Sequence, residues 1–317
     1  MTPAPLTSTR DESRSALLKV AIAAVTWGTI PLFVRAVDAN AVVIVFWRVA
    51  FAGAAIAVVG LASGQLQTWR AVPVRRRFAI LGMGVLLALN WVLYLGALKL
   101  TSVAIATLLA YCGPVIVAAL TPVVTKEPFD RRIVLPLLLS FGGIVAIIGP
   151  QDLSLGGGTR LLGAALALAS AFTYAFLVLN VKRVVRGVPS VVYMTGEYLS
   201  AGLILLPAVI LMPGPSRPIE WGALAALGIV DTALTGLLFI SALRRVRADH
   251  AAALTYAEPV SAVLFSAAFL NEPVTLATAI GGVLVVAGGI RVARMEPQQG
   301  IETPGIVPEG VDERGEP

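Results

Sequence analysis

The chain has 317 residues, of which 57% are hydrophobic and only 13% are charged. A soluble domain is about half apolar and about a quarter charged, so this composition excludes an ordinary soluble enzyme, a disordered protein and a nucleic-acid-binding domain. One cysteine and one histidine exclude a disulfide framework and a histidine-based zinc site, so we expect no metal and no cofactor. We attribute the net charge of +6 to basic loops beside a membrane.

Ten apolar segments follow one another along the chain, each near the ~20 residues that a helix needs to cross a bilayer. They are far longer than the roughly 10 residues of a barrel strand. The sequence therefore predicts an all-α integral membrane protein with ten transmembrane helices. The predicted spans are 16–34, 41–62, 78–98, 102–124, 133–149, 161–181, 190–211, 221–243, 249–270 and 274–293.

Basic residues gather in the two tails and in every second connection, with 19 on that side and 4 on the other. Cytoplasmic loops carry such an excess of Lys and Arg. We therefore expect a multi-pass protein of the plasma or inner cell membrane with both termini in the cytoplasm. Residues 1–15 and 294–317 are predicted to be disordered cytoplasmic tails, because Thr, Ser, Pro, Gly and Glu dominate them.

The chain contains a hidden repeat. Residues 97–128 and 242–273 share nine identities of 32 at a fixed offset of 145, and the least common of these are Tyr111 with Tyr256 and Pro114 with Pro259. The repeat divides the chain into two halves of five spans, 16–149 and 161–293, joined by a linker at 150–160. A second copy of an odd-span unit enters the membrane from the opposite side, so the halves are predicted to be inverted repeats, which is a transporter architecture.

Three motifs carry a family resemblance. They are Pro114 followed by Lys126-Glu127-Pro128, Tyr256-Ala257-Glu258-Pro259-Val260 followed by Asn271-Glu272-Pro273, and Trp27 together with Arg48. These motifs resemble the drug/metabolite transporter superfamily, specifically its EamA-type ten-helix branch. The resemblance covers nearly all of 16–293 and implies a central cavity lined by spans from both halves. It implies transport, in most members export, of amino acids, other small metabolites or drug-like compounds, and leaves the substrate open.

Four charged side chains fall deep inside predicted spans, away from their ends: Arg48, Glu197, Asp231 and Glu258. A charge at the bilayer centre costs at least about 2.5–3.5 kcal/mol on insertion scales, so each should face a partner or a cavity. At about 1.5 Å of rise per residue, Arg48 lies about 5–6 Å in depth from Asp231 and Glu258 and farther from Glu197. We expect an ion pair between Arg48 and Asp231 or Glu258. Bracing roles for Arg48, Glu197 and Glu258 stay open, and Asp231 is the most specific candidate for function.

Neutral side chains at similar depths complete the predicted site. Asn90 accompanies the charges, and the aromatic candidates are Trp27, Tyr94, Tyr111, Tyr174 and Tyr256. Such rings can stack on a solute or hold a cation, or they can serve helix packing alone. Pro114 and Pro259 are predicted to kink the fourth and ninth spans beside the cavity. Three carboxylates face one guanidinium, so either proton coupling or a cationic or zwitterionic solute fits.

The rival classes are weaker. An intramembrane enzyme could use Asp231 and Glu258 as an acid–base pair, but no serine–histidine or metal constellation accompanies them, so we do not expect an enzyme. The sequence predicts a secondary active transporter, an exporter by resemblance, working by alternating access. A facilitative exchanger or importer is the alternative, and a non-transporting scaffold is the remote one. The expected partners are a small organic solute, the bilayer and protons, in a monomer or homodimer.

Overall fold

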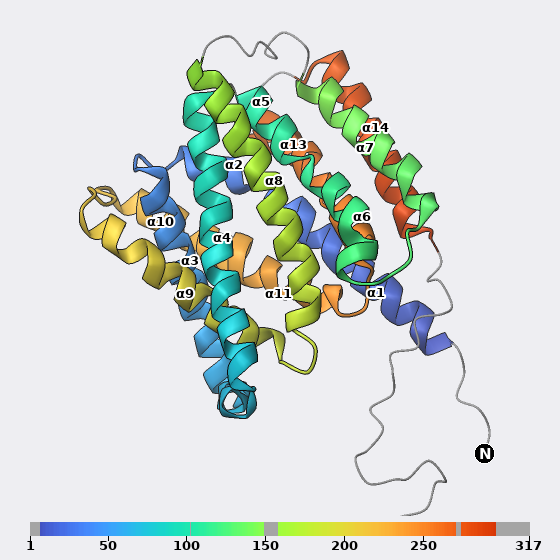
Figure 1. The fold of residues 1–317 in the computed structure, drawn as a ribbon. Coiled ribbons are helices and arrows are strands. Elements are labelled where there is room, and N and C mark those ends of the chain that lie inside the picture. The colour runs from blue at the N-terminus through green and yellow to red at the C-terminus, as the bar shows by residue number, and fades with distance from the viewer. Residues whose placement is uncertain (1–6, 102, 149–157, 271–273, 296–317) are drawn as a thin grey trace, which may run out of the picture.

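The computed structural model describes residues 7–101, 103–148, 158–270 and 274–295. Within these ranges every regular element is a helix, and the long helices run side by side (Figure 1). Nine helical segments of the described chain are long and apolar enough to cross a bilayer. The predicted all-α membrane class is therefore confirmed. The prediction of a disordered tail over 1–15 is wrong for residues 7–15, which are helical because the first helix begins well before its apolar stretch. Residues 158–160 of the predicted linker are helical as well. The rest of the linker, residues 1–6 and residues 296–317 lie outside the described residues.

The fifth predicted span corresponds to a shorter helix, α7 (Val134–Ile148), which ends where the description of this region stops. It packs along α14 (Leu276–Ala293), and the two helices form a pair at one side of the molecule (Figure 1). A Cβ atom added to Gly143 would lie 2.5 Å from the carbonyl oxygen of Gly281, whereas Gly142 has nothing within 4 Å. The close approach expected of small residues in membrane helices thus involves Gly143 on α7 and Gly281 and Gly288 on α14, and not Gly142.

Three spans that the sequence predicted as continuous are broken in the middle. The first consists of α1 (Thr7–Trp27) and α2 (Ile30–Arg35), the fourth of α5 (Val103–Ala110) and α6 (Gly113–Val124), and the ninth of α12 (Ala248–Leu254) and α13 (Ala257–Leu270). Each second helix carries a proline in its first turn: Pro31, Pro114 and Pro259. Proline is tolerated there because the backbone N–H has no partner to lose. The predicted kinks are therefore complete breaks placed just before the prolines.

The eighth span changes helix type instead of breaking. It runs from α10 (Pro218–Gly228) through a π-helical segment, η4 (Ile229–Leu234), into α11 (Thr235–Leu243). A π-segment carries one extra residue per turn and often marks a functional position. The remaining helices are α3 (Ala41–Ala62), α4 (Val74–Leu100), α8 (Gly158–Val184) and α9 (Ser190–Ile210), with short 3-10 turns η1 (Gln65–Ala71) and η2 (Arg131–Ile133).

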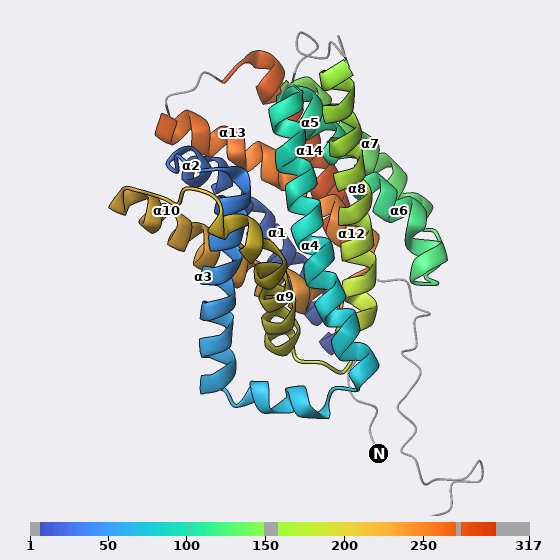
Figure 2. The same cartoon turned by 60° about the vertical axis from the view of Figure 1, so that its left-hand side comes forward.

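Helices of the two sequence halves interleave in the bundle. α4 packs on α8 and α9, α3 packs on α9 and α10, and α1 packs on α11 and α13. Figure 2 shows α4 and α8 running nearly parallel down one side, with α3, α9 and α10 on the other. The largest buried apolar cluster draws on α1, α3, α4, α8, α9, α11 and α12, so the core belongs to both halves.

Candidate functional site

A cavity of about 550 Å³ lies among helices of both halves. It collects side chains that are far apart in sequence, including the four charged candidates Arg48, Glu197, Asp231 and Glu258. Nine of the ten predicted site residues line it: Trp27, Arg48, Asn90, Tyr94, Tyr111, Tyr174, Glu197, Asp231 and Glu258. The tenth, Tyr256, is fully buried behind the wall. Pro114 also lines the cavity, and Pro259 does not.

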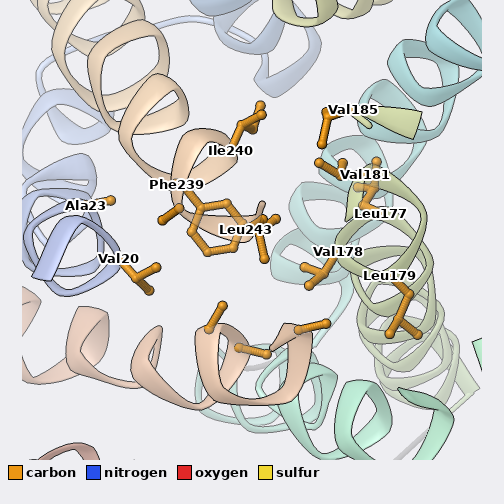
Figure 3. Close-up of a cluster of buried hydrophobic side chains, with 14 of the residues drawn as sticks. Val20, Ala23, Leu177, Val178, Leu179, Val181, Val185, Phe239, Ile240 and Leu243 are labelled. Carbon is orange, nitrogen blue, oxygen red and sulfur yellow. The ribbon is translucent and has the colours of Figure 1, made fainter. Parts of the chain in front are cut away.

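The two ends of the cavity differ. At the end near α2 the lining side chains Ile30, Val34 and Ala39 are half-buried. At the other end the lining narrows to Val181 and Ile240, near the last turns of α8 and α11. Beyond them Val185 and Leu243 are both 0% exposed. Figure 3 shows these side chains facing one another between the two helices, so this end of the cavity is closed by apolar packing.

Asp231 sits on the π-segment and is fully buried. One carboxylate oxygen accepts a hydrogen bond from the Thr29 hydroxyl at 2.8 Å, and the other has no hydrogen-bond partner. Its backbone carbonyl accepts from the Trp27 indole N–H at 3.0 Å. A buried carboxylate oxygen without a donor is costly unless a ligand, water or proton satisfies it. Asp231 therefore offers an unfilled acceptor beside the cavity.

Arg48 is held by the same π-segment, but not through its carboxylate. The guanidinium donates from Nε to the Thr232 hydroxyl at 2.6 Å and from Nη2 to the Asp231 backbone carbonyl at 3.5 Å. It also stacks 4.1 Å above the Trp91 ring, in a cation–π contact. Among the described residues Arg48 forms no ion pair with Asp231, Glu258 or Glu197.

The predicted ion pair of Arg48 is therefore wrong. Depths taken from a rise of about 1.5 Å per residue assume that the eighth span is a regular α-helix with its backbone carbonyls paired. The π-segment instead presents a carbonyl and a hydroxyl to the guanidinium, while the Asp231 carboxylate faces Thr29. The cavity thus holds a guanidinium and a carboxylate that are close but separately anchored.

Glu258 is the second residue of α13, immediately after the break in the ninth span. Its carboxyl group lies near the Tyr111 side chain at the break in the fourth span. The Tyr256 hydroxyl donates to the Tyr111 backbone carbonyl at 2.8 Å, and the two rings lie 6.1 Å apart. The repeat-related tyrosines therefore meet each other, and Tyr256 joins the two broken spans from behind the wall.

The remaining predicted residues have protein partners. Asn90 donates to the Ser170 carbonyl at 2.7 Å, which braces α4 against α8. Glu197 is 4% exposed and accepts from the Tyr193 hydroxyl at 2.7 Å. The hydroxyl groups of Tyr94 and Tyr174 lie 3.5 Å and 3.3 Å from the threonine hydroxyls of Thr107 and Thr255. These side chains shape the wall of the cavity and connect its helices.

Sequence reasoning missed three residues that anchor the charged groups. They are Thr29, Thr232 and Tyr198, whose hydroxyl donates to the Thr232 carbonyl at 3.1 Å. Their signal in the sequence is weak, because hydroxyl side chains are common in membrane helices and usually bond their own backbone. A threonine directly after Asp231, and another directly after Trp27-Gly28, are the only hints.

Close backbone contacts hold the breaks in place. A Cβ atom added to Gly28, in the first break, would lie 2.6 Å from the backbone nitrogen of Ala262 in α13. One added to Gly113, after the second break, would lie 2.7 Å from the Tyr174 ring. Glycine is needed at both points because any side chain would separate the packed segments. The break in the first span therefore touches the helix that carries Glu258.

Comparison with known proteins gives a consistent picture. The EamA-like transporter family matches the chain twice, over residues 14–149 and 161–293. An uncharacterized transporter of Archaeoglobus fulgidus is 29% identical over 269 residues, which cover 85% of this chain and 93% of the relative. The uncharacterized transporter YxxF of Bacillus subtilis is 28% identical over 295 residues, 90% and 91% of the two chains. A solved crystal structure matches with a TM-score of 0.75 at 24% identity, over 88% of this chain and 97% of that one, and shows the fold.

Proposed function

The chain belongs to the EamA-like transporter family, and from this premise we propose that it is a secondary active transporter that moves a small organic solute by alternating access. The observation that carries the proposal is the cavity. It lies between the two halves, and its lining side chains are partly exposed at one end and buried at the other. It also contains a buried carboxylate oxygen of Asp231 without a hydrogen-bond partner. A carrier needs such a site to hold its solute near the middle of the membrane.

Helix contacts between the halves support an inverted repeat of two five-span units, 16–149 and 161–293, with α7 as the fifth of ten spans. In the repeat, spans 1 to 5 correspond in order to spans 6 to 10. The contact of span 3 with span 6 therefore has its counterpart in the contact of span 8 with span 1, and that of span 4 with span 6 in that of span 9 with span 1. Three further contacts join corresponding spans to each other: span 2 with span 7, span 4 with span 9, and span 5 with span 10. A twofold axis in the membrane plane requires this pattern.

The charge distribution supports cytoplasmic termini in a plasma or inner membrane. In that orientation the half-exposed end of the cavity near α2 faces outward and the closed end near Val185 and Leu243 faces the cytoplasm. We infer export from the family resemblance, with a facilitative exchanger or importer as the alternative. Proton coupling fits three buried carboxyl groups beside one guanidinium, because a solute and a proton can compete for Asp231 or Glu258.

A thermal-shift screen of the purified protein tests this proposal. The probes are amino acids, nucleobases, sugars and lipophilic cations, each at neutral and at acidic pH. A ligand that binds only the folded state raises the unfolding temperature. We expect a hit in one class that Asp231→Asn abolishes and that Arg245→Gln, an exposed position outside the cavity, retains. Stabilisation by none of the four classes, with Asp231→Asn behaving as wild type, would favour a scaffold that transports nothing.

A further inference from the structure

Beyond the closed end of the cavity lies a group of charged side chains that the transport site does not use. Lys182, in the last turn of α8, forms an ion pair with Glu127 and donates to the Val246 carbonyl at 3.0 Å. Arg247 pairs with Asp249 at 2.9 Å. We call the set the cytoplasmic lock, and its members are Glu127, Asp130, Lys182, Arg247, Asp249 and His250.

Three contacts of the lock cross from one half of the chain to the other: Lys182 with Glu127, Arg247 with the Pro128 carbonyl, and His250 with Asp130. The segment after α6 supplies Glu127, Asp130 and the Pro128 carbonyl, which accepts from Arg247 at 2.9 Å. The second half supplies Lys182, Arg247 and His250, whose ring nitrogen Nε2 lies 3.5 Å from an Asp130 carboxylate oxygen. The lock therefore ties α6 to α8 and α12. α6 is the second piece of the broken fourth span, α12 is the first piece of the broken ninth span, and the two pack on each other.

Burial disfavours a partly opened lock. The Lys182 and Glu127 side chains are 11% and 8% exposed, and those of Arg247 and Asp249 are 8% and 1% exposed. Breaking one partner of a buried ion pair leaves an uncompensated charge, whereas separating both partners into water does not. The pairs therefore either stay assembled or become solvated together, which is the behaviour required of a gate.

The assembled lock also leaves hydrogen-bonding capacity unfilled. One oxygen of Glu127, the Arg247 Nη1 nitrogen and the His250 Nε2 nitrogen are buried without a hydrogen-bond partner. Each of these atoms would gain water if the lock opened. Opening would therefore regain hydration for these atoms, which offsets part of the ion pairing that it loses.

Three members of the lock have no charged counterpart in the repeat, although Glu127 corresponds to Glu272. At the repeat offset of 145, the residues that correspond to Arg247, Asp249 and His250 are Ser102, Ala104 and Ile105. The inverted repeat would make the two ends equal in shape, but only one carries these charges. This difference favours the arrangement in which the cytoplasmic end is closed, as it is here.

We propose that the cytoplasmic lock is the inner gate of the transport cycle, so that its disassembly admits water and solute from the cytoplasm to the closed end of the cavity. The proposal rests on the transport function and orientation proposed above. It assigns Lys182 and Glu127 the central role, because this pair lies directly between the end of α8 and the segment that follows α6.

Cysteine labelling in inside-out membrane vesicles tests the gate without a substrate. The full chain carries Val178→Cys, at a cavity-lining position next to the closed end, in a Cys112→Ser background. A membrane-impermeant maleimide then reports access from the cytoplasmic side. With the lock intact we expect slow labelling, and with Glu127→Gln an increase of about tenfold or more, because one buried charge has lost its partner. The charge exchange Glu127→Lys with Lys182→Glu should restore slow labelling.

An exposed ion pair at the same end provides the matched control. Arg245 and Glu12 lie 3.6 Å apart and both are 55% exposed, so Arg245→Gln should leave the labelling rate unchanged. Equal labelling of Glu127→Gln and the control, in variants that elute as folded protein, would overturn the gate. So would a charge exchange that labels as fast as the single variant. If a solute binds but the labelling rate does not respond to Glu127→Gln, the gate alone is refuted. If the labelling rate responds but no solute binds, the transport function alone is refuted.

Discussion

Thr232 shows how a single hydroxyl group can organise a buried charge. It accepts from Arg48 Nε at 2.6 Å and donates to the Leu227 carbonyl at 2.8 Å, five residues earlier in the chain. Both bonds depend on the π-segment, since the hydroxyl bridges a carbonyl that precedes the segment and a guanidinium from another helix. The orientation of Arg48 over the Trp91 ring follows from this anchor.

Replacing Thr232 with valine should destabilise the protein. The change keeps the shape of the side chain but leaves the Arg48 Nε donor and the Leu227 carbonyl without this partner. We expect a loss of about 1–3 kcal/mol in the free energy of unfolding, and a much smaller loss for Thr232→Ser, which keeps the hydroxyl. Thermal unfolding in detergent measures both variants. Equal unfolding temperatures for the two variants would mean that the hydroxyl does not anchor Arg48.

Asp130 provides a pH-dependent prediction outside the membrane spans. The side-chain hydrogen bonds from Arg132, supported by its backbone N–H, lower the pKa of Asp130 to about 2. A carboxyl group whose pKa is lowered on folding stabilises the protein fully above its unfolded pKa of about 3.9, and this contribution disappears as the pH falls through the folded value. The stability difference between wild type and Asp130→Asn should therefore be constant near neutral pH and shrink in acid. Denaturant unfolding across the acidic range measures it, and a difference that grows in acid would contradict the assignment.

Broken helices mark the limit of prediction at the scale of elements. Hydropathy located every long helix, because about 20 apolar residues give the same signal whether or not the backbone is continuous. It did not locate the breaks before Pro31, Pro114 and Pro259, since a proline inside a span also fits a kinked helix. The π-segment at Ile229–Leu234 has no compositional signal, because an extra residue per turn depends on tertiary partners.

Two adjacent glycines of α7 should respond differently to substitution. Gly143→Ala would bring a methyl group to 2.5 Å from the Gly281 carbonyl and force α7 from α14, whereas Gly142 has nothing within 4 Å. We expect Gly143→Ala to cost about 1–3 kcal/mol through overpacking. We expect Gly142→Ala to be neutral or to stabilise by about 0.5–1 kcal/mol, since alanine suits a helix better than glycine. Unfolding temperatures decide this, and equal effects would show that α7 and α14 do not approach at Gly143.

At the scale of the whole molecule, the sequence predicted which residues gather at the cavity better than it predicted their partners. Nine of ten candidates line one space, and for the four charged ones the reason is that charges in a membrane must avoid lipid, whatever the packing. Tyr256 lies outside the cavity because it bonds the Tyr111 backbone. The depth of a charged residue does not decide which group it pairs with, as Arg48 shows. The partner also depends on how each helix is rotated about its axis and on whether it is an α-helix or a π-helix.

The orientation of the molecule gives the final prediction. With 19 basic residues in the tails and alternate connections against 4 on the other side, both termini should face the cytoplasm. Green fluorescent protein fused to the C-terminus should then be fluorescent, and alkaline phosphatase fused there should be inactive. The same two fusions placed in the connection between α9 and α10, at Gly214, should give the opposite results. Phosphatase activity at the C-terminus would reverse the orientation of the whole bundle.

The apolar seal beyond Val181 and Ile240 has an electrical consequence. A water-filled cavity conducts ions, so the voltage across the membrane falls mainly over the seal. Moving one elementary charge through 100 mV changes its free energy by about 2.3 kcal/mol. A charged solute would therefore exchange between the cavity and the outside with almost no current, and would generate current only while crossing the seal. Recordings on supported membranes would resolve the two steps as a silent phase followed by an electrogenic one.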